Sequence, residues 1–315
     1  MRVLVTGATG FVGRALIAHL RERGDAITVI SRDAARAKQL GDVTIVQAEL
    51  EAPGAWWDAL AEVDAIVHLA GEPIGAKRWD ARRKQLIRDS RVETTRAIVE
   101  AIAKAQPRPR VLVTASGVDY YPFAIGHTEF DDDEVTEADP PADTFLGRVC
   151  RDWEAQAREA EKLGVRVVAM RTGLVLGPGG ALEQLARPFR RFAGGKIGTG
   201  QQWMSWIHLA DVVAAYAAAI SDDRYAGAIN VVTASVRNRD FAAALGNALH
   251  RPSWLRVPAF ALRAAVGELA ESILEGRNVV PKRLRELGFV WRYARLERAL
   301  GDALGLHSDT RDVAG

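Results

Sequence analysis

Several residues and patterns that mark other protein classes are scarce in this chain. Its 315 residues include a single cysteine, Cys150, which excludes an intramolecular disulfide and a cysteine-based zinc site. No apolar run reaches the ~20 residues of a membrane span. The 42 basic residues are interleaved with 40 acidic ones, giving a net charge of +2 without a basic block for nucleic acid or membrane surfaces. The start lacks the basic and long apolar regions of a signal peptide, so we expect a cytoplasmic protein, monomeric or homodimeric, with no bound metal.

The chain is rich in short runs of apolar, often β-branched residues that alternate with helical patterns. Because these runs are continuously apolar, they are typical of parallel strands buried on both faces. The fold class is therefore α/β, a Rossmann-type doubly wound parallel sheet. The predicted strands are RVLVTG, AITVIS, VTIVQA, AIVHLAG, RVLVTAS, VRVVAMRTG and AINVVT.

The alternation stops after the sixth strand, at a stretch rich in glycine and arginine, and later gives way to helical patterns punctuated by prolines. This change predicts a smaller, mostly helical C-terminal subdomain inserted into and following the sheet domain. The predicted division is 1–173 plus about 206–233 for the Rossmann domain, about 174–205 plus 234–305 for the small domain, and 306–315 for a tail.

The first strand runs into GATGFVG, with glycines at three-residue intervals before a helix. Glycine lets the chain turn tightly there and lets backbone N–H groups and the helix dipole approach a pyrophosphate. The alternative is a tight structural turn without a ligand. The residues of this turn that we expect to bind a dinucleotide are Gly7, Thr9, Gly10, Phe11, Val12 and Gly13.

The second strand ends in Ser31 and Arg32, where NAD sites commonly carry an acidic residue for the ribose 2′-hydroxyl. A guanidinium matches the oxygens of a 2′-phosphate, and a serine adds a hydroxyl donor. The sequence therefore favours NADP over NAD. Two alternatives remain: Asp33, one place later, as a ribose ligand, and Arg32 as a solvated charge at a helix start.

With these residues, the chain resembles an atypical branch of the extended short-chain dehydrogenases/reductases, the NAD(P)-dependent epimerase/dehydratase-like proteins. The resemblance covers nearly the whole chain and rests on TGATGFVG, HLAGEPI, KRW, the SR of IRDSRVETT, RTGLVLGPGG, WMSWIHLADV and the C-terminal GE, PKRL and LGF. It implies a substrate cleft between the sheet and the small domain, and hydride exchange at a nicotinamide. It also implies that Leu69, Ala70, Gly71, Thr172 and Gly173 border the cofactor.

The resemblance further implies a catalytic tyrosine with a lysine four residues later, and this pair is missing. Counting back from Glu154 places Cys150 at the lysine position and Leu146 at the tyrosine position. No tyrosine of the chain has a lysine four places on. Cys150, on a helix, is more typical of a small buried side chain than of an acid.

Four other side chains are candidates for the cleft, each with a structural alternative. Ser116 matches the family's serine or threonine position and is either a substrate ligand or a strand-end cap. Tyr121 carries a phenolic proton or forms an aromatic wall. Glu72 is an acid/base or an anchor for Arg78 or Arg91. His208 we expect to brace the two domains. The stretch 122–143, acidic at 131–134, is either a lid over the cleft or a solvated loop.

The leading hypothesis is an NADP-binding oxidoreductase or epimerase acting on a small polar molecule, with an atypical active site. The missing tyrosine and lysine motivate the alternative, a non-catalytic NADP-binding sensor or scaffold.

Overall fold

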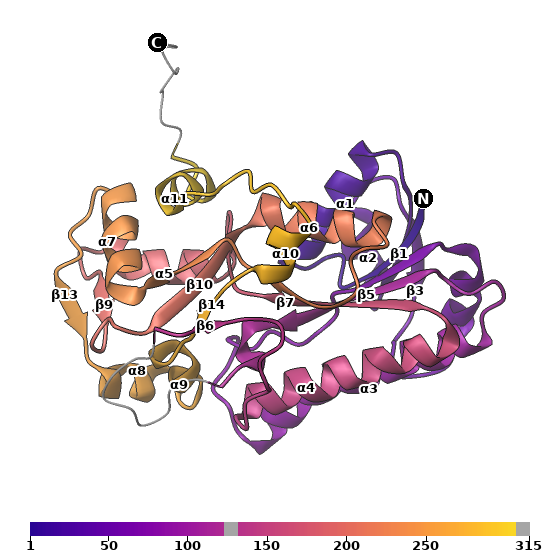
Figure 1. Ribbon diagram of the computed structural model, residues 1–315, viewed down its shortest axis with the longest axis horizontal. Helices are drawn as coiled ribbons and strands as arrows, with labels where there is room; N and C mark the ends of the chain where they lie inside the picture. Colours follow the sequence, from indigo (N-terminus) through magenta and orange to yellow (C-terminus); the bar gives the residue numbers. More distant parts are fainter. Residues whose placement is uncertain (123–131, 307–315) are drawn as a thin grey trace, which may run out of the picture.

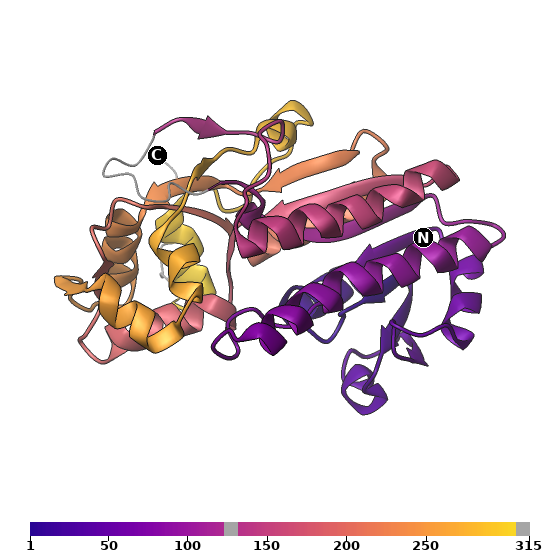
Figure 2. The same cartoon turned by 90° about the horizontal axis from the view of Figure 1, so that it is seen from below.

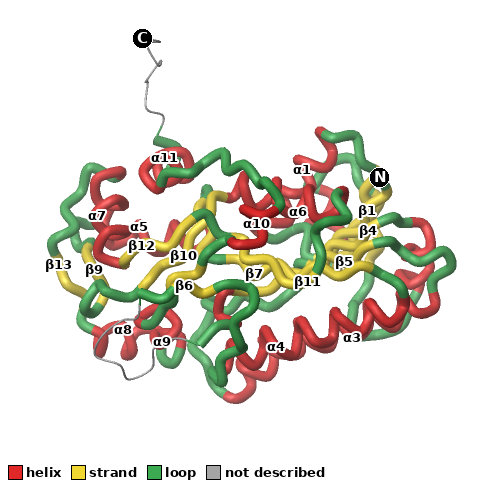
Figure 3. The backbone as a smooth tube through the Cα atoms, viewed as in Figure 1, coloured by secondary structure: helices red, strands yellow, loops and turns green. Residues whose placement is uncertain are grey.

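The computed structural model describes residues 1–122 and 132–306. Its centre is a seven-stranded sheet in the order β11-β7-β5-β4-β1-β2-β3 (Figures 1 and 3). Neighbouring strands all run parallel. The strands are β1 (Arg2–Thr6), β2 (Ala26–Ser31), β3 (Thr44–Gln47), β4 (Ala65–His68), β5 (Val111–Gly117), β7 (Arg166–Thr172) and β11 (Gly227–Val231). They coincide with the seven predicted strands, so the predicted doubly wound sheet is confirmed.

Helices cover both faces of this sheet, and alternate strand residues feed two separate cores. On one face α1 (Phe11–Glu22) packs beside α6 (Leu209–Ser221); on the other, α3 (Ala81–Lys104) lies along α4 (Phe145–Arg158) (Figure 2). Val3 and Val5 of β1 enter the first core, whereas Leu4 enters the second. This alternation explains why the strands carry apolar residues at successive positions and not at every second one. Shorter helical segments complete the layers: α2 (Ala34–Lys38), η1 (Ala55–Glu62), η2 (Val118–Tyr120) and η3 (Glu159–Leu163).

The helix that faces the expected cleft, α4, begins at a defined point. Thr144 caps it, its hydroxyl accepting a hydrogen bond from the Gly147 backbone N–H at 3.1 Å. A Cβ on Gly147 would lie 2.6 Å from the Ala142 carbonyl oxygen, so only glycine allows the first turn to sit this close to the preceding loop. These two contacts fix where Cys150 and Glu154 lie along the helix.

The smaller part of the molecule contains strands as well as helices. A three-stranded sheet, in the order β12-β10-β8, packs against α5, α7 and α11 around a core that includes Phe189, Trp206 and Leu300. The elements of this smaller part are β8 (Leu174–Leu176), α5 (Gly180–Arg190), β9 (Gly195–Ile197), β10 (Trp203–His208), β12 (Ala234–Arg237), α7 (Asn238–Ala248), β13 (Leu255–Val257), α8 (Ala259–Val266), α9 (Leu269–Leu274) and α11 (Leu296–Ala303). The predicted domain boundary at 206 falls inside β10, and the division into two domains stays a proposal.

A short two-stranded sheet ties the segment after β5 to the C-terminal region. In it β6 (Glu134–Val135) pairs with β14 (Asn278–Val279), shortly before α10 (Lys282–Glu286). Part of the predicted loop 122–143 is thus a paired strand; residues 123–131 of that loop, and 307–315 of the predicted tail, lie outside the described residues. Within the described ranges, no helix has both the length and the apolar character needed to cross a membrane.

Candidate functional site

The register of the sheet brings the predicted cofactor residues to one edge. Thr6 is level with Ile30 of β2 and with His68 of β4. His68 is level with Thr114, and Gly117 with Thr172. The residues that end or follow these strands therefore meet at the carboxyl edge, where doubly wound sheets bind their ligands. They are Gly7, Ser31, Arg32, Leu69, Ala70, Gly71, Thr172 and Gly173.

The three glycines of the first turn have different surroundings. Gly7 has a φ of +69°, and a Cβ there would lie 2.6 Å from the Leu69 carbonyl carbon. A Cβ on Gly13 would lie 2.4 Å from the Gly7 carbonyl oxygen. Gly10 differs, because a Cβ there would meet only that same oxygen, at 3.1 Å. Gly7 and Gly13 thus allow the turn to form, whereas a Cβ on Gly10 would have this single close contact.

The first turn of α1 is left without a side-chain cap. Gly10 is the N-cap residue, and no side chain of residues 1–122 or 132–306 accepts a hydrogen bond from the first backbone N–H groups. Such N–H groups, together with the helix dipole, form an anion site. Of the other predicted residues here, Phe11 packs its ring against Gly177 and Gly180, and Val12 packs against the core.

The end of β2 presents a free cation. The Arg32 side chain is exposed, and among the described residues it has no hydrogen-bond or ion-pair partner. Ser31 donates its hydroxyl proton to the Asp33 carbonyl oxygen at 3.0 Å. The Asp33 carboxylate accepts from the Arg36 backbone N–H at 2.9 Å and so caps α2. This cap argues against Asp33 as the ribose ligand and leaves Arg32 as the charge beside the turn.

Two further guanidiniums, not identified from the sequence, converge on the glycine turn. Arg14 Nε and Arg36 Nη2 both donate to the Thr9 carbonyl oxygen, at 3.0 and 3.4 Å. Both side chains belong to exposed residues. Arg14 directly follows Gly13, but Arg36 lies outside the motif, in α2, so the sequence gave no sign that the two would meet; the packing of α2 against the turn brings them together.

A buried histidine relay stabilises the end of β4. Thr6 Oγ1 lies 2.6 Å from His68 Nδ1, and Thr94 Oγ1 lies 3.2 Å from Nε2. Because Thr94 donates to the Ser90 carbonyl oxygen and Thr6 accepts from the Ala70 N–H, the consistent assignment is a neutral ring protonated on Nε2. Burial, with a smaller effect of nearby Arg91, lowers the pKa of His68 to about 3. His68 is therefore a neutral support for the chain beside the turn.

The two predicted catalytic side chains, Ser116 and Tyr121, lie in one buried polar network. Ser116 donates to Glu154 Oε1 at 2.7 Å, and Glu154 binds Arg171 through two hydrogen bonds of 2.8 Å. Arg171 donates to the Tyr121 hydroxyl at 2.8 Å, and that hydroxyl donates to Asn230 Oδ1 at 2.6 Å. Every polar group of the network is thus paired with another.

Accessibility and proton affinity argue against proton transfer by these groups. Tyr121 is fully buried and Ser116 nearly so. Burial raises the pKa of the Tyr121 phenol above its ordinary value, despite the nearby Arg171 guanidinium. Burial also raises the pKa of the Cys150 thiol to about 12. The geometry favours a supporting role for Ser116 and Tyr121, whose catalytic role stays a prediction.

An aspartate at the end of β5, overlooked at the sequence level, lies beside these groups. A Cβ on Gly117 would lie 3.3 Å from Asp119 Oδ2 and 3.9 Å from Cys150 Sγ. The same test on Gly71 places the Arg91 guanidinium carbon at 3.2 Å. The sequence signal for Asp119 was an acidic residue two positions after a buried strand.

Glu72 and His208 have structural partners. Glu72 pairs with Arg83 at 2.5 Å, whereas Arg91 donates to the Glu72 carbonyl oxygen and Arg78 to that of Ala264. The anchoring interpretation thus holds, but the partner of the Glu72 carboxylate is neither Arg78 nor Arg91.

His208 connects β10 and α6 with the C-terminal segment, as expected for a bracing residue. Its Nδ1 accepts from the Ala210 N–H, and its Nε2 lies 3.1 Å from Asp302 Oδ2. Its ring centre lies 3.8 Å from that of Tyr293, whose hydroxyl donates to Asp302 at 2.7 Å.

Comparison with known proteins gives two family matches and several relatives. Residues 3–232 match the NAD dependent epimerase/dehydratase family, and residues 257–303 match a domain of unknown function (DUF1731). The chain is 42% identical over 311 residues to the Epimerase family protein SDR39U1 homolog, chloroplastic, of Arabidopsis thaliana, covering 95% of this chain and 86% of the relative.

Two solved structures extend the match to the whole fold. The human epimerase family protein SDR39U1 (isoform2), solved with NADPH, is 34% identical with a TM-score of 0.81, covering 97% of this chain and 99% of that one. The nucleoside-diphosphate sugar epimerase from Corynebacterium glutamicum is 32% identical with a TM-score of 0.76, covering 97% of this chain and 58% of that one. The family model spans most of the chain and the relatives match nearly all of it, so the chain belongs to the NAD dependent epimerase/dehydratase family.

Proposed function

We propose that the chain is an NADP-dependent oxidoreductase or epimerase acting on a small polar substrate. The observation that carries the proposal is the uncapped start of α1 at Gly10, flanked by the exposed Arg32. The start of α1 fits the negatively charged pyrophosphate of a dinucleotide, and Arg32 fits the additional 2′-phosphate of NADP. The NADPH in the human relative supports the same choice.

Different residues of the carboxyl edge match different parts of NADP. Backbone N–H groups at the start of α1 would bind the pyrophosphate. Arg32 would pair with the 2′-phosphate, and Arg14 and Arg36, gathered at the Thr9 carbonyl, would add positive charge there. Since this end of the dinucleotide lies at β2, its nicotinamide would lie toward the other half of the sheet. There Gly71 and Thr172 would border it.

When bound, the nicotinamide supplies or accepts a hydride at a substrate carbon. The chain would hold the substrate carbonyl or alcohol against the ends of β5 and β7 and would move one proton at its oxygen. The network from Ser116 to Asn230 would keep these strand ends rigid, because each of its polar groups already has a partner.

A specific observation also favours the second candidate function, an NADP-binding sensor or scaffold. The side chains at the family's tyrosine and lysine positions, Leu146 and Cys150, are both buried; leucine has no acidic proton, and burial raises the pKa of the Cys150 thiol to about 12, too weak an acid to exchange a proton readily near neutral pH. A sensor would use the cofactor site alone and would not require an acid or base in the cleft.

A substrate screen that follows NADPH absorbance distinguishes the two functions. The purified protein is incubated with NADPH and panels of small carbonyl compounds and of sugar nucleotides, and sugar products are checked for inversion. Turnover over many cycles with any member supports the enzyme. Tight NADPH binding without turnover across both panels supports the sensor, and failure to bind NADPH contradicts both.

A further inference from the structure

Asp119 lies where the carboxyl ends of β4 and β5 meet α3 and α4. It belongs to η2, the turn that begins directly after Gly117. Its Oδ2 and Cys150 Sγ lie within 4 Å of the same point, the position of a Cβ on Gly117. Cys150 occupies the family's lysine position on α4. The carboxyl group of Asp119 thus reaches, from the strand side, the space that the missing pair would reach from the helix side.

The charged groups around Asp119 are nearly all engaged elsewhere. From α4, Glu154 is bound to Arg171 of β7 and to Ser116, and Cys150 is a neutral thiol. From α3, Arg91 faces the carboxyl group; its Nη1 donates to the Glu72 and Ile87 carbonyl oxygens. Within the described part of the chain, the Asp119 carboxyl forms no ion pair and accepts no hydrogen bond from another residue. It is therefore available to a ligand.

Burial and nearby positive charge act in opposite directions on the pKa of the Asp119 carboxyl group. Burial raises the pKa of Asp119 to about 6, while its own backbone N–H and the positive charge of Arg91 act in the opposite direction. Near neutral pH both forms are populated, which is the condition for giving a proton in one direction and taking it in the other. Neither Tyr121 nor Cys150 meets this condition.

We propose that the carboxyl group of Asp119 is the acid and base of the cleft, in the place of the family's tyrosine. The inference rests on the proposed function and adds a named proton donor to it. In reduction, the carbonyl π bond breaks as hydride adds at carbon, and the Asp119 O–H bond breaks as the substrate O–H bond forms. The substrate is reduced and the dihydronicotinamide is oxidised. The carboxylate then regains its proton from water, and oxidation of the alcohol reverses each step.

The placement is tested by cofactor binding, without a substrate. The oxidised nicotinamide ring carries a positive charge and the reduced ring does not, so an ionised carboxylate beside the ring favours NADP⁺. We expect the affinity for NADP⁺ relative to NADPH to rise at least fivefold between pH 5 and pH 7.5, with a midpoint near 6. In Asp119→Asn the ratio becomes independent of pH. Asp64→Asn, at the opposite edge of the sheet, keeps the native rise.

The possible outcomes distinguish a failure of the Asp119 proposal from a failure of the proposed function. A flat ratio in the native protein, or a rise that persists in Asp119→Asn, overturns the inference and leaves the proposed function standing. No binding of either nucleotide overturns both. Asp119→Ser serves as a second variant where Asp119→Asn fails to fold. In addition, ¹³C NMR of aspartate-labelled native protein must show one carboxyl group that titrates near pH 6 and shifts to lower pH with NADP⁺; the absence of such a group also overturns the inference.

A carbonyl substrate found in the screen adds a kinetic test. With it, Asp119→Asn should lower kcat by 10²-fold or more while the Kd for NADPH stays within threefold of native. Asp119→Glu should restore part of the rate. An unchanged kcat in Asp119→Asn contradicts the proposal.

Discussion

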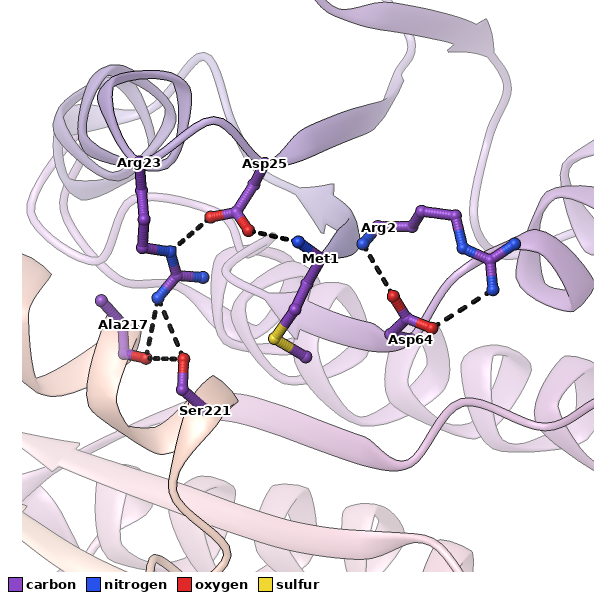
Figure 4. Close-up of polar contacts among 7 residues, drawn as sticks. All are labelled: Met1, Arg2, Arg23, Asp25, Asp64, Ala217 and Ser221. Carbon is purple, nitrogen blue, oxygen red and sulfur yellow. Dashed lines mark hydrogen bonds and ion pairs between the residues drawn. The ribbon is translucent and has the colours of Figure 1, made fainter.

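The two edges of the central sheet differ in whether their charged groups are paired. At the amino edge, charges neutralise one another (Figure 4). The Met1 ammonium group and Arg23 both pair with Asp25, at 2.7 and 2.5 Å, and Arg2 pairs with Asp64 at 3.2 Å. Asp64 also accepts from the Arg2 backbone N–H at 2.9 Å. This edge satisfies its polar groups with its own side chains.

At the carboxyl edge, the half around β1 and β2 leaves its groups open. The start of α1 has no side-chain cap, and Arg32 is exposed without a partner among the residues described. The half around β5 and β7 is closed by the Ser116–Asn230 network, with Asp119 left beside it. Unmatched donors and charges, rather than charges as such, therefore mark where a ligand would bind. The following changes test that contrast.

The largest effect is expected for Gly10→Val, which places a side chain at the start of α1, where the pyrophosphate would bind. The backbone of Gly10 has a φ of −76°, which valine adopts without strain. We expect binding of NADPH and NADH to fall about 100-fold or more, about 2.8 kcal/mol, while the fold persists. Calorimetric titration measures this loss. Ala18→Val, which also introduces valine but on the exposed face of the same helix, should bind as the native protein does. Native affinity in Gly10→Val would contradict the assignment of this turn.

Arg32→Glu should reverse or abolish the cofactor preference. Loss of a charge-assisted phosphate contact costs about 1.5–3 kcal/mol, or roughly tenfold to more than a hundredfold in the NADPH affinity. The NADH affinity should change little. Fluorescence titration with both nucleotides gives the ratio. An Arg32→Glu protein that still prefers NADPH would mean that Arg14 and Arg36 carry the 2′-phosphate contact.

His68 should make the fold sensitive to acid. Its folded pKa of about 3 lies below the unfolded value of about 6.5, so its contribution is complete above pH 6.5 and is lost as the pH falls toward 3. Between pH 7 and 5 the loss is about 2 kcal/mol. Asp119 acts in the opposite sense over part of this range, because its folded pKa is raised. The test is therefore the difference in unfolding free energy between native protein and His68→Gln at each pH. A difference that does not change with pH would contradict a neutral buried His68.

The smallest effect is expected for Asp64→Asn at the amino edge. A partly exposed ion pair contributes below about 1 kcal/mol, and neither cofactor affinity should change. The Arg2 backbone N–H and, to a smaller extent, its side chain lower the pKa of Asp64. Its contribution is therefore present above pH 4 and is lost only as the pH falls below its ordinary range. Thermal melting at pH 7 measures the difference. A tenfold change in the NADPH affinity of Asp64→Asn would contradict the assignment of the cofactor site to the carboxyl edge alone.

The sequence predicted the features that are encoded locally. Each of the seven strands contains a short run of apolar residues, and the glycine turn and Arg32 directly follow two of them, so their places at the carboxyl edge follow from strand order alone. The strands of the smaller part were missed: β8, β9, β12 and β13 have only three or four residues, most of them half-buried, and β10, with six, pairs among the described residues only with these short strands.

The closed half of the site was beyond sequence reasoning for the same reason. Ser116 meets Glu154 across 38 positions, and Tyr121 meets Asn230 across 109. Only the packing of α4 and β11 against the ends of β5 and β7 brings these groups together. A match to the family's serine or threonine position identified Ser116, and Tyr121 was identified only as a phenol that follows it; neither signal showed whether these hydroxyl groups were free.

The central claim is that the open half of the carboxyl edge is an NADP site. Titration of the native protein with NADPH and with NADH at pH 7, by calorimetry under identical conditions, tests it most directly. The account predicts saturable binding of both at one site per chain, with NADPH at least tenfold tighter. Equal affinities, a preference for NADH, or no binding of either nucleotide would contradict it.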